Sequence, residues 1–154
     1  MQIKEKISLV FGVPSEVFLK SLKTKKIFVA ELRPGLEGTK LVALRALENG
    51  IQPVVICDNM PAFCMKQGLV KDVRIFYNML KKDSSLCRTG SLMAALCARM
   101  HGIPVYLSKG AAVSLKPASL HKIDGRQVTS AEIKTCVPLM EKVPLKLISK
   151  ISKI

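Results

Sequence analysis

The chain has 154 residues, about the length of one soluble domain. Hydrophobic residues make up 49% of it, which excludes an intrinsically disordered chain, and no apolar run approaches the roughly 20 residues that cross a bilayer. Lysine and arginine number 25 against 11 acidic residues, a formal charge of +14, so the chain should attract polyanions such as nucleic acid or phosphorylated small molecules.

Short β-type runs alternate with helical patterns, which predicts βαβ units and a parallel sheet. The expected strands are residues 7–11, 26–30, 53–57, 73–77 and 104–107. The run 53–57 is continuously apolar, which is typical of a strand covered on both faces. We therefore expect an α/β fold with one doubly wound, mostly parallel sheet between two helical layers (α/β/α), spanning residues 1–154 as a single domain.

Helices are expected between these strands, at Pro14-Ser15 and beyond, over Gly38–Glu48, from Asp58-Asn59 to Gly68, and before His101. A polar loop over 81–85 should lead into the last of these helices, whose apolar side includes Leu92, Leu96 and Met100. The segment 145–154 has apolar residues at helical spacing opposite lysines. We expect it to dock on the domain or on a neighbouring subunit rather than on a membrane.

The loops after the strands should converge. In a parallel sheet every strand-to-helix loop opens on the same edge, where helix N-termini supply free N–H groups. Residues 12–15, 33–39, 58–60 and 78–90 should therefore meet there. Any ligand site belongs on this edge, where an anion would suit the helix dipoles together with Arg33 or Arg88.

The segment 31–39 is the most informative of these loops. Gly35 and Gly38 would let backbone N–H groups approach an anion, and Arg33 adds a planar fork that suits phosphate. Neither the Walker pattern nor the dinucleotide-binding glycine pattern is present. The alternative is a glycine-containing turn with a purely structural role.

The cysteines indicate no metal site. There are five of them, and none forms a C-x-x-C pair, so neither a zinc site nor a disulfide framework is expected. We expect no cofactor, and the chain is interpreted as cytoplasmic.

Several segments, in order, resemble those of one family: Glu31-x-Arg33-Pro34-x-x-Glu37-Gly38, Gly50-Ile51-x-Pro53-Val54, Asp58-Asn59-Met60 and His101-Gly102-Ile103-Pro104-Val105-Tyr106. The set resembles the C-terminal Rossmann-like domain of methylthioribose-1-phosphate isomerase, ribose-1,5-bisphosphate isomerase and the regulatory subunits of initiation factor 2B. The resemblance covers nearly the whole chain, which leaves no room for the N-terminal domain of the isomerases. It implies a Rossmann-like fold and a sugar-phosphate or nucleotide ligand.

The sequence departs from this family at the catalytic positions. The loop 10–14 lacks the family's catalytic cysteine, Tyr77 or Asn78 stands in place of its catalytic aspartate, and its substrate-contacting Asn-Lys pair is here Cys87-Arg88. Tyr77 and Cys87 are the weak catalytic candidates. Arg88 and a nearby helix N-terminus could lower the pKa of the Cys87 thiol; the alternative is a packing thiol.

Three hypotheses follow. The first is a non-catalytic or regulatory module that binds a phosphorylated ligand, the second is an aldose–ketose sugar-phosphate isomerase, including one half of a split enzyme, and the third is a translation-related protein that contacts RNA through its charge. The expected ligand-binding residues are Glu31, Arg33, Gly35, Gly38, Asp58, Asn78 and Arg88.

Two residues or groups carry further alternatives. Asp58 could cap the following helix instead of binding a sugar hydroxyl. The resemblance places Asn59, Met60 and Phe63 near a subunit contact, which implies a homodimer or a partner protein subunit.

Overall fold

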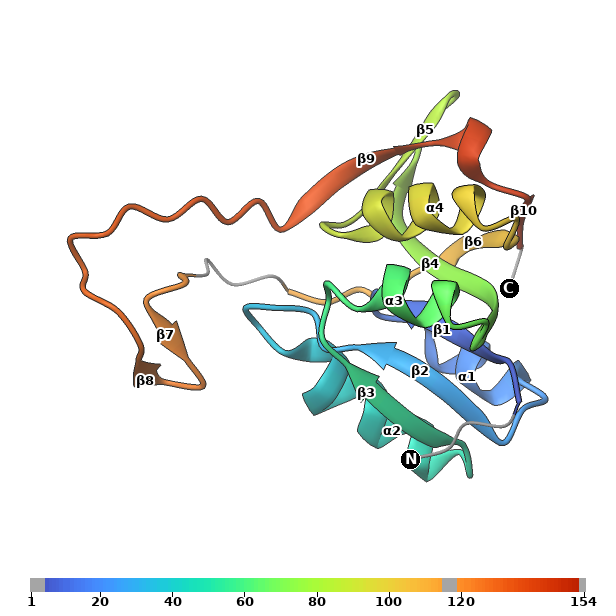
Figure 1. Cartoon of the computed structure of the whole chain (residues 1–154), viewed down its shortest axis with the longest axis horizontal. Coiled ribbons are helices and arrows are strands. Elements are labelled where there is room, and N and C mark those ends of the chain that lie inside the picture. The colour runs from blue at the N-terminus through green and yellow to red at the C-terminus, as the bar shows by residue number, and fades with distance from the viewer. Residues whose placement is uncertain (1–4, 115–118, 153–154) are drawn as a thin grey trace.

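The computed structural model describes residues 5–114 and 119–152 (Figure 1). Parallel neighbours form a sheet in the order β10-β6-β4-β1-β2-β3. These strands are β1 (Ile7–Phe11), β2 (Lys26–Ala30), β3 (Gln52–Ile56), β4 (Val70–Leu80), β6 (Val105–Lys109) and β10 (Lys150–Ile151). The expected α/β fold with a mostly parallel sheet is confirmed.

The helices cover both faces of this sheet. They are α1 (Glu16–Ser21), the π-helix η1 (Gly38–Ala43), its continuation α2 (Leu44–Glu48), α3 (Pro61–Lys66), α4 (Ser91–Met100) and the 3₁₀ turn η2 (Leu145–Leu147). Helices α3 and α4 contact each other in front of the sheet, and α1 and α2 contact each other behind it (Figure 1). The three expected layers are therefore present.

Helix α1 shows how local sequence and core packing agree. Ser15 caps it, because its side-chain oxygen accepts a hydrogen bond of 3.2 Å from the Phe18 backbone N–H. Phe18 and Leu19 are buried. The Phe18 ring meets the Phe76 ring of β4 edge-on, with centroids 4.9 Å apart, and so fixes α1 against the sheet.

Two expectations about buried faces are wrong. Among the described strands, β3 lies at the edge and pairs only with β2, so Val55 is 41% exposed instead of covered. In α4 the alanines are buried, whereas Leu96 and Met100 are exposed. Small residues let α4 approach the sheet closely, which leaves its larger apolar side chains on the outside.

The segment 78–90, expected to be a loop, is largely a β-hairpin. The end of β4 turns into the antiparallel strand β5 (Ser84–Arg88), and β9 (Met140–Pro144) pairs antiparallel with the other side of β5. The pairing of β5 with a strand more than 50 residues later explains the error, because no local pattern reports it. These two strands form an antiparallel annex to the parallel sheet.

The terminal segment docks on the domain as expected, but its described residues form the 3₁₀ turn η2 and strand β10 instead of one continuous helix. Ile151 of β10 lies beside Leu107 of β6, and the part of the helical pattern at residue 154 lies outside the described residues. None of the helices described in residues 5–114 and 119–152 has the length and apolar character to cross a membrane.

An arm leaves the body between β6 and β9. Its described residues, 111–114 and 119–139, include the small hairpin of β7 (Lys122–Ile123) and β8 (Arg126–Gln127), seen at the left of Figure 1. An ion pair between Lys40 of η1 and Asp124 ties the arm back to the body.

Candidate functional site

Two of the loops that were expected to meet are joined by Asp58. This residue follows β3, and its carboxylate accepts hydrogen bonds from the backbone N–H groups of Leu32 (2.9 Å) and Arg33 (2.6 Å), which follow β2. The N-cap of α3 is Met60, with no side-chain capping bond. The helix-capping interpretation of Asp58 is therefore wrong: its carboxylate holds the loop after β2.

That loop is tightly held against β2. Leu32 and Leu36 both have φ of 60°, a left-handed conformation that costs a non-glycine residue about 1–2 kcal/mol. Position 38 has room only for glycine, because a Cβ there would lie 1.8 Å from the carbonyl oxygen of Ala30. Such strain near a rim of loops is typical of a functional segment.

Arg88 connects the annex to this loop. It lies at the end of β5 and is buried. Its Nη2 atom lies 3.2 Å from Oε1 and 3.0 Å from Oε2 of Glu37, 51 residues earlier in the chain. Its Nη1 atom is also buried and has no hydrogen-bond partner among residues 5–114 and 119–152. One donor of the guanidinium is therefore left without an acceptor.

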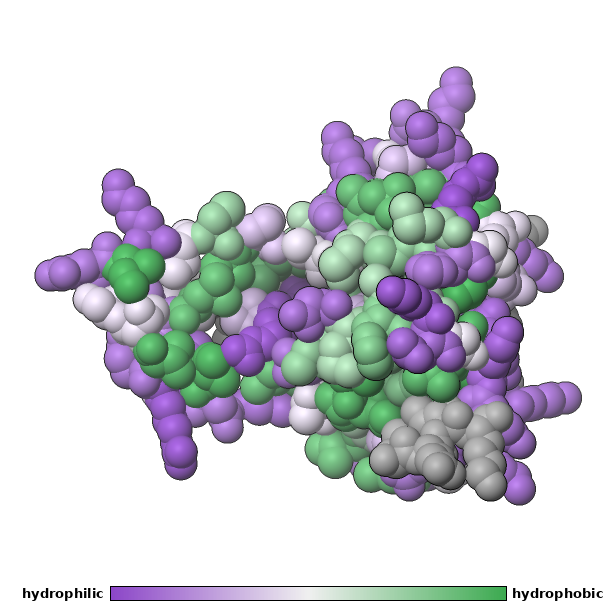
Figure 2. Space-filling view, in the orientation of Figure 1, coloured by the Kyte–Doolittle hydropathy of each residue, from purple (hydrophilic) through white to green (hydrophobic). Residues whose placement is uncertain are grey.

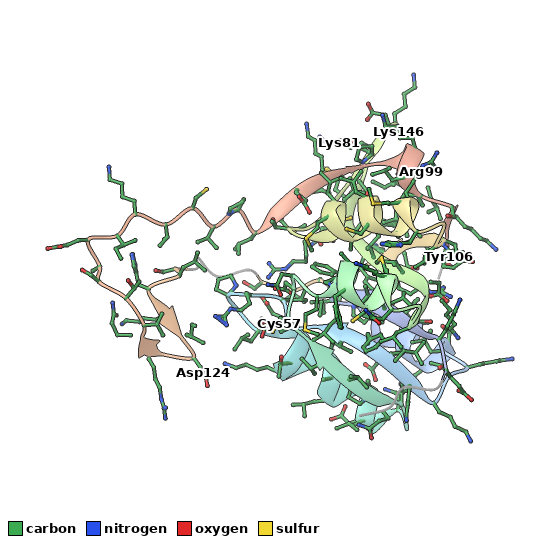
Figure 3. The ribbon with its side chains drawn as sticks, in the orientation of Figure 1. Cys57, Lys81, Arg99, Tyr106, Asp124 and Lys146 are labelled. Atoms are coloured by element: carbon green, nitrogen blue, oxygen red, sulfur yellow. The ribbon has the colours of Figure 1, made fainter. Side chains whose placement is uncertain are left out.

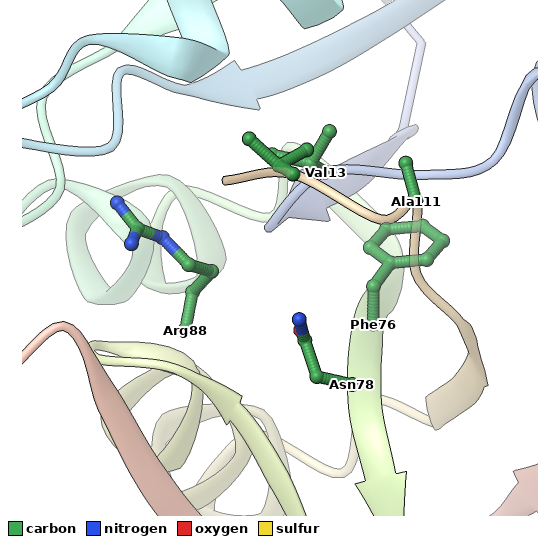
Figure 4. Close-up of a pocket in the computed structure, with 6 residues that line it drawn as sticks. Val13, Phe76, Asn78, Arg88 and Ala111 are labelled. Atoms are coloured by element: carbon green, nitrogen blue, oxygen red, sulfur yellow. The ribbon is translucent and has the colours of Figure 1, made fainter. Parts of the chain in front are cut away.

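Arg88 lines a small hollow at the carboxyl edge of the strands. Figure 4 shows its guanidinium and the Asn78 amide on one side and Val13, Phe76 and Ala111 around them. The enclosed volume is about 10 Å³, which is room for one water molecule. The hollow can thus admit a single polar group of a ligand.

A larger hollow is lined by Glu37, the partner of Arg88. It has a volume of about 410 Å³, within the range of small-molecule sites, and it opens between the 34–40 loop and the arm. Figure 2 shows hydrophilic side chains where the arm meets the body. Its lining residues are Pro34, Gly35, Glu37, Lys40, Ser114, Ser119, Lys122, Asp124, Gly125 and Leu139.

Most of this larger lining was missed by the sequence reasoning. Glu37 stands in the recognised motif, but nothing local indicates that it would pair with Arg88. Lys40, Lys122 and Asp124 belong to no motif, and Figure 3 shows Asp124 out on the arm. Lys40 and Asp124 form an ion pair because the arm folds back onto the body.

The N-terminus of α4 already binds an internal anion. The Oε1 atom of Glu141 on β9 accepts hydrogen bonds from the backbone N–H groups of Gly90 (2.7 Å) and Leu92 (2.9 Å). A carboxylate at this position is stabilised by the helix dipole. The start of α4 therefore already holds a carboxylate of the chain.

Cys87 is a packing thiol. It is fully buried and its Sγ lies 3.4 Å from Ser85 Oγ. Burial in apolar surroundings raises the pKa of its thiol to about 11, so the expected lowering by Arg88 is wrong. Tyr77, the other catalytic candidate, is half-buried and lies opposite Cys87 in the β4–β5 ladder.

The remaining predicted residues lie at the surface. The Nε atom of Arg33 is 4.0 Å from Glu31 Oε1, so the two side chains form a weak ion pair. Asn59 and Phe63 are exposed and Met60 is half-buried. Within the described residues, no three histidine, cysteine, aspartate or glutamate side chains gather as a metal site would require.

The chain is similar to two kinds of known protein. It is 31% identical over 144 residues to the methylthioribose-1-phosphate isomerase of Carboxydothermus hydrogenoformans, over 84% of this chain and 42% of that protein. It is 31% identical over 111 residues to the enzyme of that name from Nostoc punctiforme, over 71% of this chain and 30% of that one. The chain therefore spans less than half the length of these relatives.

Solved structures share the fold. Subunit delta of translation initiation factor eIF-2B from A. fulgidus superposes with a TM-score of 0.81 at 20% identity, over 96% of this chain and 52% of that chain. The 5-methylthioribose 1-phosphate isomerase of Pyrococcus horikoshii OT3 gives 0.80 at 20% identity, over 96% and 49%. A model of the initiation factor 2 subunit family matches residues 8–152, and the chain therefore belongs to that family.

Proposed function

We propose that this chain is a non-catalytic, regulatory module that binds a phosphorylated small molecule, a sugar phosphate or a nucleotide, at the carboxyl edge of its sheet. The observation that supports this most directly is Arg88: a buried guanidinium, fixed by Glu37, with one donor unpartnered among the described residues at a hollow. Buried polar groups are normally satisfied. A ligand oxygen is the acceptor that this site lacks.

The surroundings support the same proposal. The larger hollow has the volume of a small-molecule site, and Lys40 and Lys122 line it. Arg33 lies on the neighbouring loop, which Asp58 holds in place. Several donors from separate parts of the sequence thus converge on one rim.

Ligand-induced stabilisation tests the proposal, because a ligand that binds only the folded state raises its melting temperature. Ribose 5-phosphate, ribose 1,5-bisphosphate and the adenine and guanine nucleotides form the panel. At least one should raise the melting temperature, and Arg88→Met and Arg33→Ala should reduce the rise. Arg99→Met, which changes an arginine in the last turn of α4, at the other end of that helix from Gly90, is the matched control and should keep it. No shift with any compound would refute the proposal.

A second candidate function is sugar-phosphate isomerisation, supported by the names of relatives at 31% identity. That reaction requires a group that moves a proton. With a pKa of about 11, the Cys87 thiol stays protonated at neutral pH, which makes it a poor base. Turnover of methylthioribose 1-phosphate, followed by NMR and stopped by Cys87→Ser or Tyr77→Phe, would favour catalysis over regulation.

We also propose that the exposed surface of α3 forms a subunit contact. Phe63 is 56% exposed there, and Asn59 and Met60 precede it at the start of the helix. An exposed phenylalanine beside a half-buried methionine is the kind of apolar anchor that protein interfaces use.

A further inference from the structure

Three groups at this rim that suit an anion already hold a carboxylate of the chain itself. The backbone N–H groups of Leu32 and Arg33 bind Asp58, those at the start of α4 bind Glu141, and Nη2 of Arg88 binds Glu37. These three groups are thus internally neutralised, although the chain as a whole carries +14.

Glu37 differs from the other two carboxylates in what it holds. Asp58 and Glu141 satisfy backbone N–H groups, so their loss would leave backbone donors unpaired. Glu37 holds a side chain, and its own side chain is 20% exposed and lines the larger hollow, whereas that of Arg88 is 7% exposed. Of these three carboxylates, Glu37 is the one that lines the larger hollow.

The geometry of the pair restricts what Arg88 can bind. Both short contacts of Glu37 are made to Nη2, which leaves Nη1 without a partner in the part of the chain that the structure describes. A phosphate dianion that approached Nη1 would lie close to the Glu37 carboxylate in a poorly solvated place, where like charges repel strongly. A neutral hydroxyl or carbonyl oxygen meets no such repulsion.

We propose that Glu37 is a specificity-determining residue. Its carboxylate pairs with Nη2 of Arg88, leaves Nη1 to bind a neutral oxygen of the ligand, and repels phosphate from Arg88. This inference rests on the proposed function and deepens it. A hydroxyl or carbonyl oxygen of the ligand would then enter the small hollow beside Arg88, and its phosphate would bind away from Arg88.

Glu37→Gln tests this, because it removes the charge and keeps the shape and one acceptor for Arg88. Inorganic phosphate is the probe, with affinity measured by titration calorimetry. Glu37→Gln and Glu37→Ala should both bind phosphate about tenfold or more tightly than the native chain, since charge-assisted contacts of arginine are strong. Glu48→Gln, an equal change of net charge at the exposed end of α2, is the control and should change affinity less than twofold.

A double variant keeps the test specific to Arg88. In Glu37→Gln/Arg88→Met the gain should vanish, with circular dichroism to confirm that the fold is kept. Equal or weaker phosphate binding by both Glu37 variants would overturn the inference. If the native chain binds a phosphorylated ligand and the variants bind phosphate no more tightly, the proposed function stands and the role of Glu37 is refuted. If the variants bind phosphate more tightly but the native chain binds no ligand of the panel, the proposed function is refuted and the repulsion by Glu37 stands.

Discussion

The parallel half of the sheet, β1–β2–β3, and the antiparallel annex, β5 with β9, differ in how far the local sequence predicts their strands. In the parallel half each strand is an apolar run followed by its own helix, so the chain's local pattern already defines it. In the annex, β5 finds its partners through pairings such as Cys87 with Glu141, which no local pattern encodes. The rim needs both, because Arg88 comes from the annex and Glu37 from the parallel half.

The difference teaches how the site is held together. The loop after β2 is fixed by local constraints, namely a glycine pressed on β2 and the bonds from Asp58. The annex is held by the β4–β5 and β5–β9 ladders, and the long-range contacts of Arg88 and Glu141 join it to the rim. Damage to the first should therefore affect the whole fold, and damage to the second should affect the rim.

The largest effect is expected from Gly38→Ala in the parallel half. Its Cβ would lie 1.8 Å from the backbone oxygen of Ala30, and backbone cannot yield as a side-chain end can. Overpacking of this kind should cost about 3 kcal/mol of unfolding free energy, measured by urea denaturation. Gly50→Ala is the control: φ is 73° there but space is open, so it should cost only about 1 kcal/mol. Equal losses would show that the close approach is unimportant.

The same contrast explains how much of the fold the sequence could predict. The bounds 7–11 and 26–30 coincide with β1 and β2, because apolar runs and the helix signals that follow them are local. The sequence of β5 is Ser84-Ser85-Leu86-Cys87-Arg88, a mixed polar run that is typical of a loop. It is identified as a strand by its pairing with β9. The exposed apolar side of α4 was misjudged because alanines, and not leucines, face the sheet.

A smaller effect is expected in the annex, from the titration of Cys87. Burial raises the pKa of this thiol from the ordinary 9.0 to about 11. Between these values the unfolded chain has lost the proton and the folded chain keeps it, so stability is full below pH 9 and falls as the pH rises. The loss by pH 11 should be about 2–3 kcal/mol, measured by urea denaturation across that range.

Cys87→Ala isolates this contribution. Other groups also titrate above pH 9, and burial raises the pKa of the Cys64 thiol too, so the difference in slope between the native chain and the variant is the quantity to compare. The variant should lose stability less steeply from pH 9 to 11. Parallel slopes would mean that the thiol is accessible to water.

Glu141→Ala should have a still smaller effect on stability and a clear local one. It removes the carboxylate that caps α4 at Gly90 and Leu92, which should cost about 1–2 kcal/mol and lower the melting temperature. Glu141→Gln keeps an acceptor and should recover most of the loss. Glu132→Ala, an exposed glutamate on the arm, is the control. An unchanged melting temperature in Glu141→Ala would show that the cap does not support the annex.

The candidate site was predictable only in part, for the same physical reason. Convergence of the loops at 33 and 58 follows from the parallel topology, and Asp58 does join them. The Arg88–Glu37 pair depends on where β5 lies, and the hollow beside it depends on the arm, whose return through Lys40 and Asp124 has no sequence pattern. Ligand contacts by the predicted residues therefore stay predictions.

The smallest effect on stability is expected at the surface where the two regions adjoin, since α3 of the parallel half contacts α4 next to the annex. Phe63→Lys changes a side chain that is 56% exposed and should alter the unfolding free energy by less than about 0.5 kcal/mol. It should nevertheless shift a dimer toward monomer in analytical ultracentrifugation, because a lysine at the contact adds repulsion between chains that each carry +14. Val17→Lys, 64% exposed on α1 behind the sheet, changes charge equally and should leave the dimer intact. Equal sedimentation of both variants and the native chain would place any subunit contact away from α3.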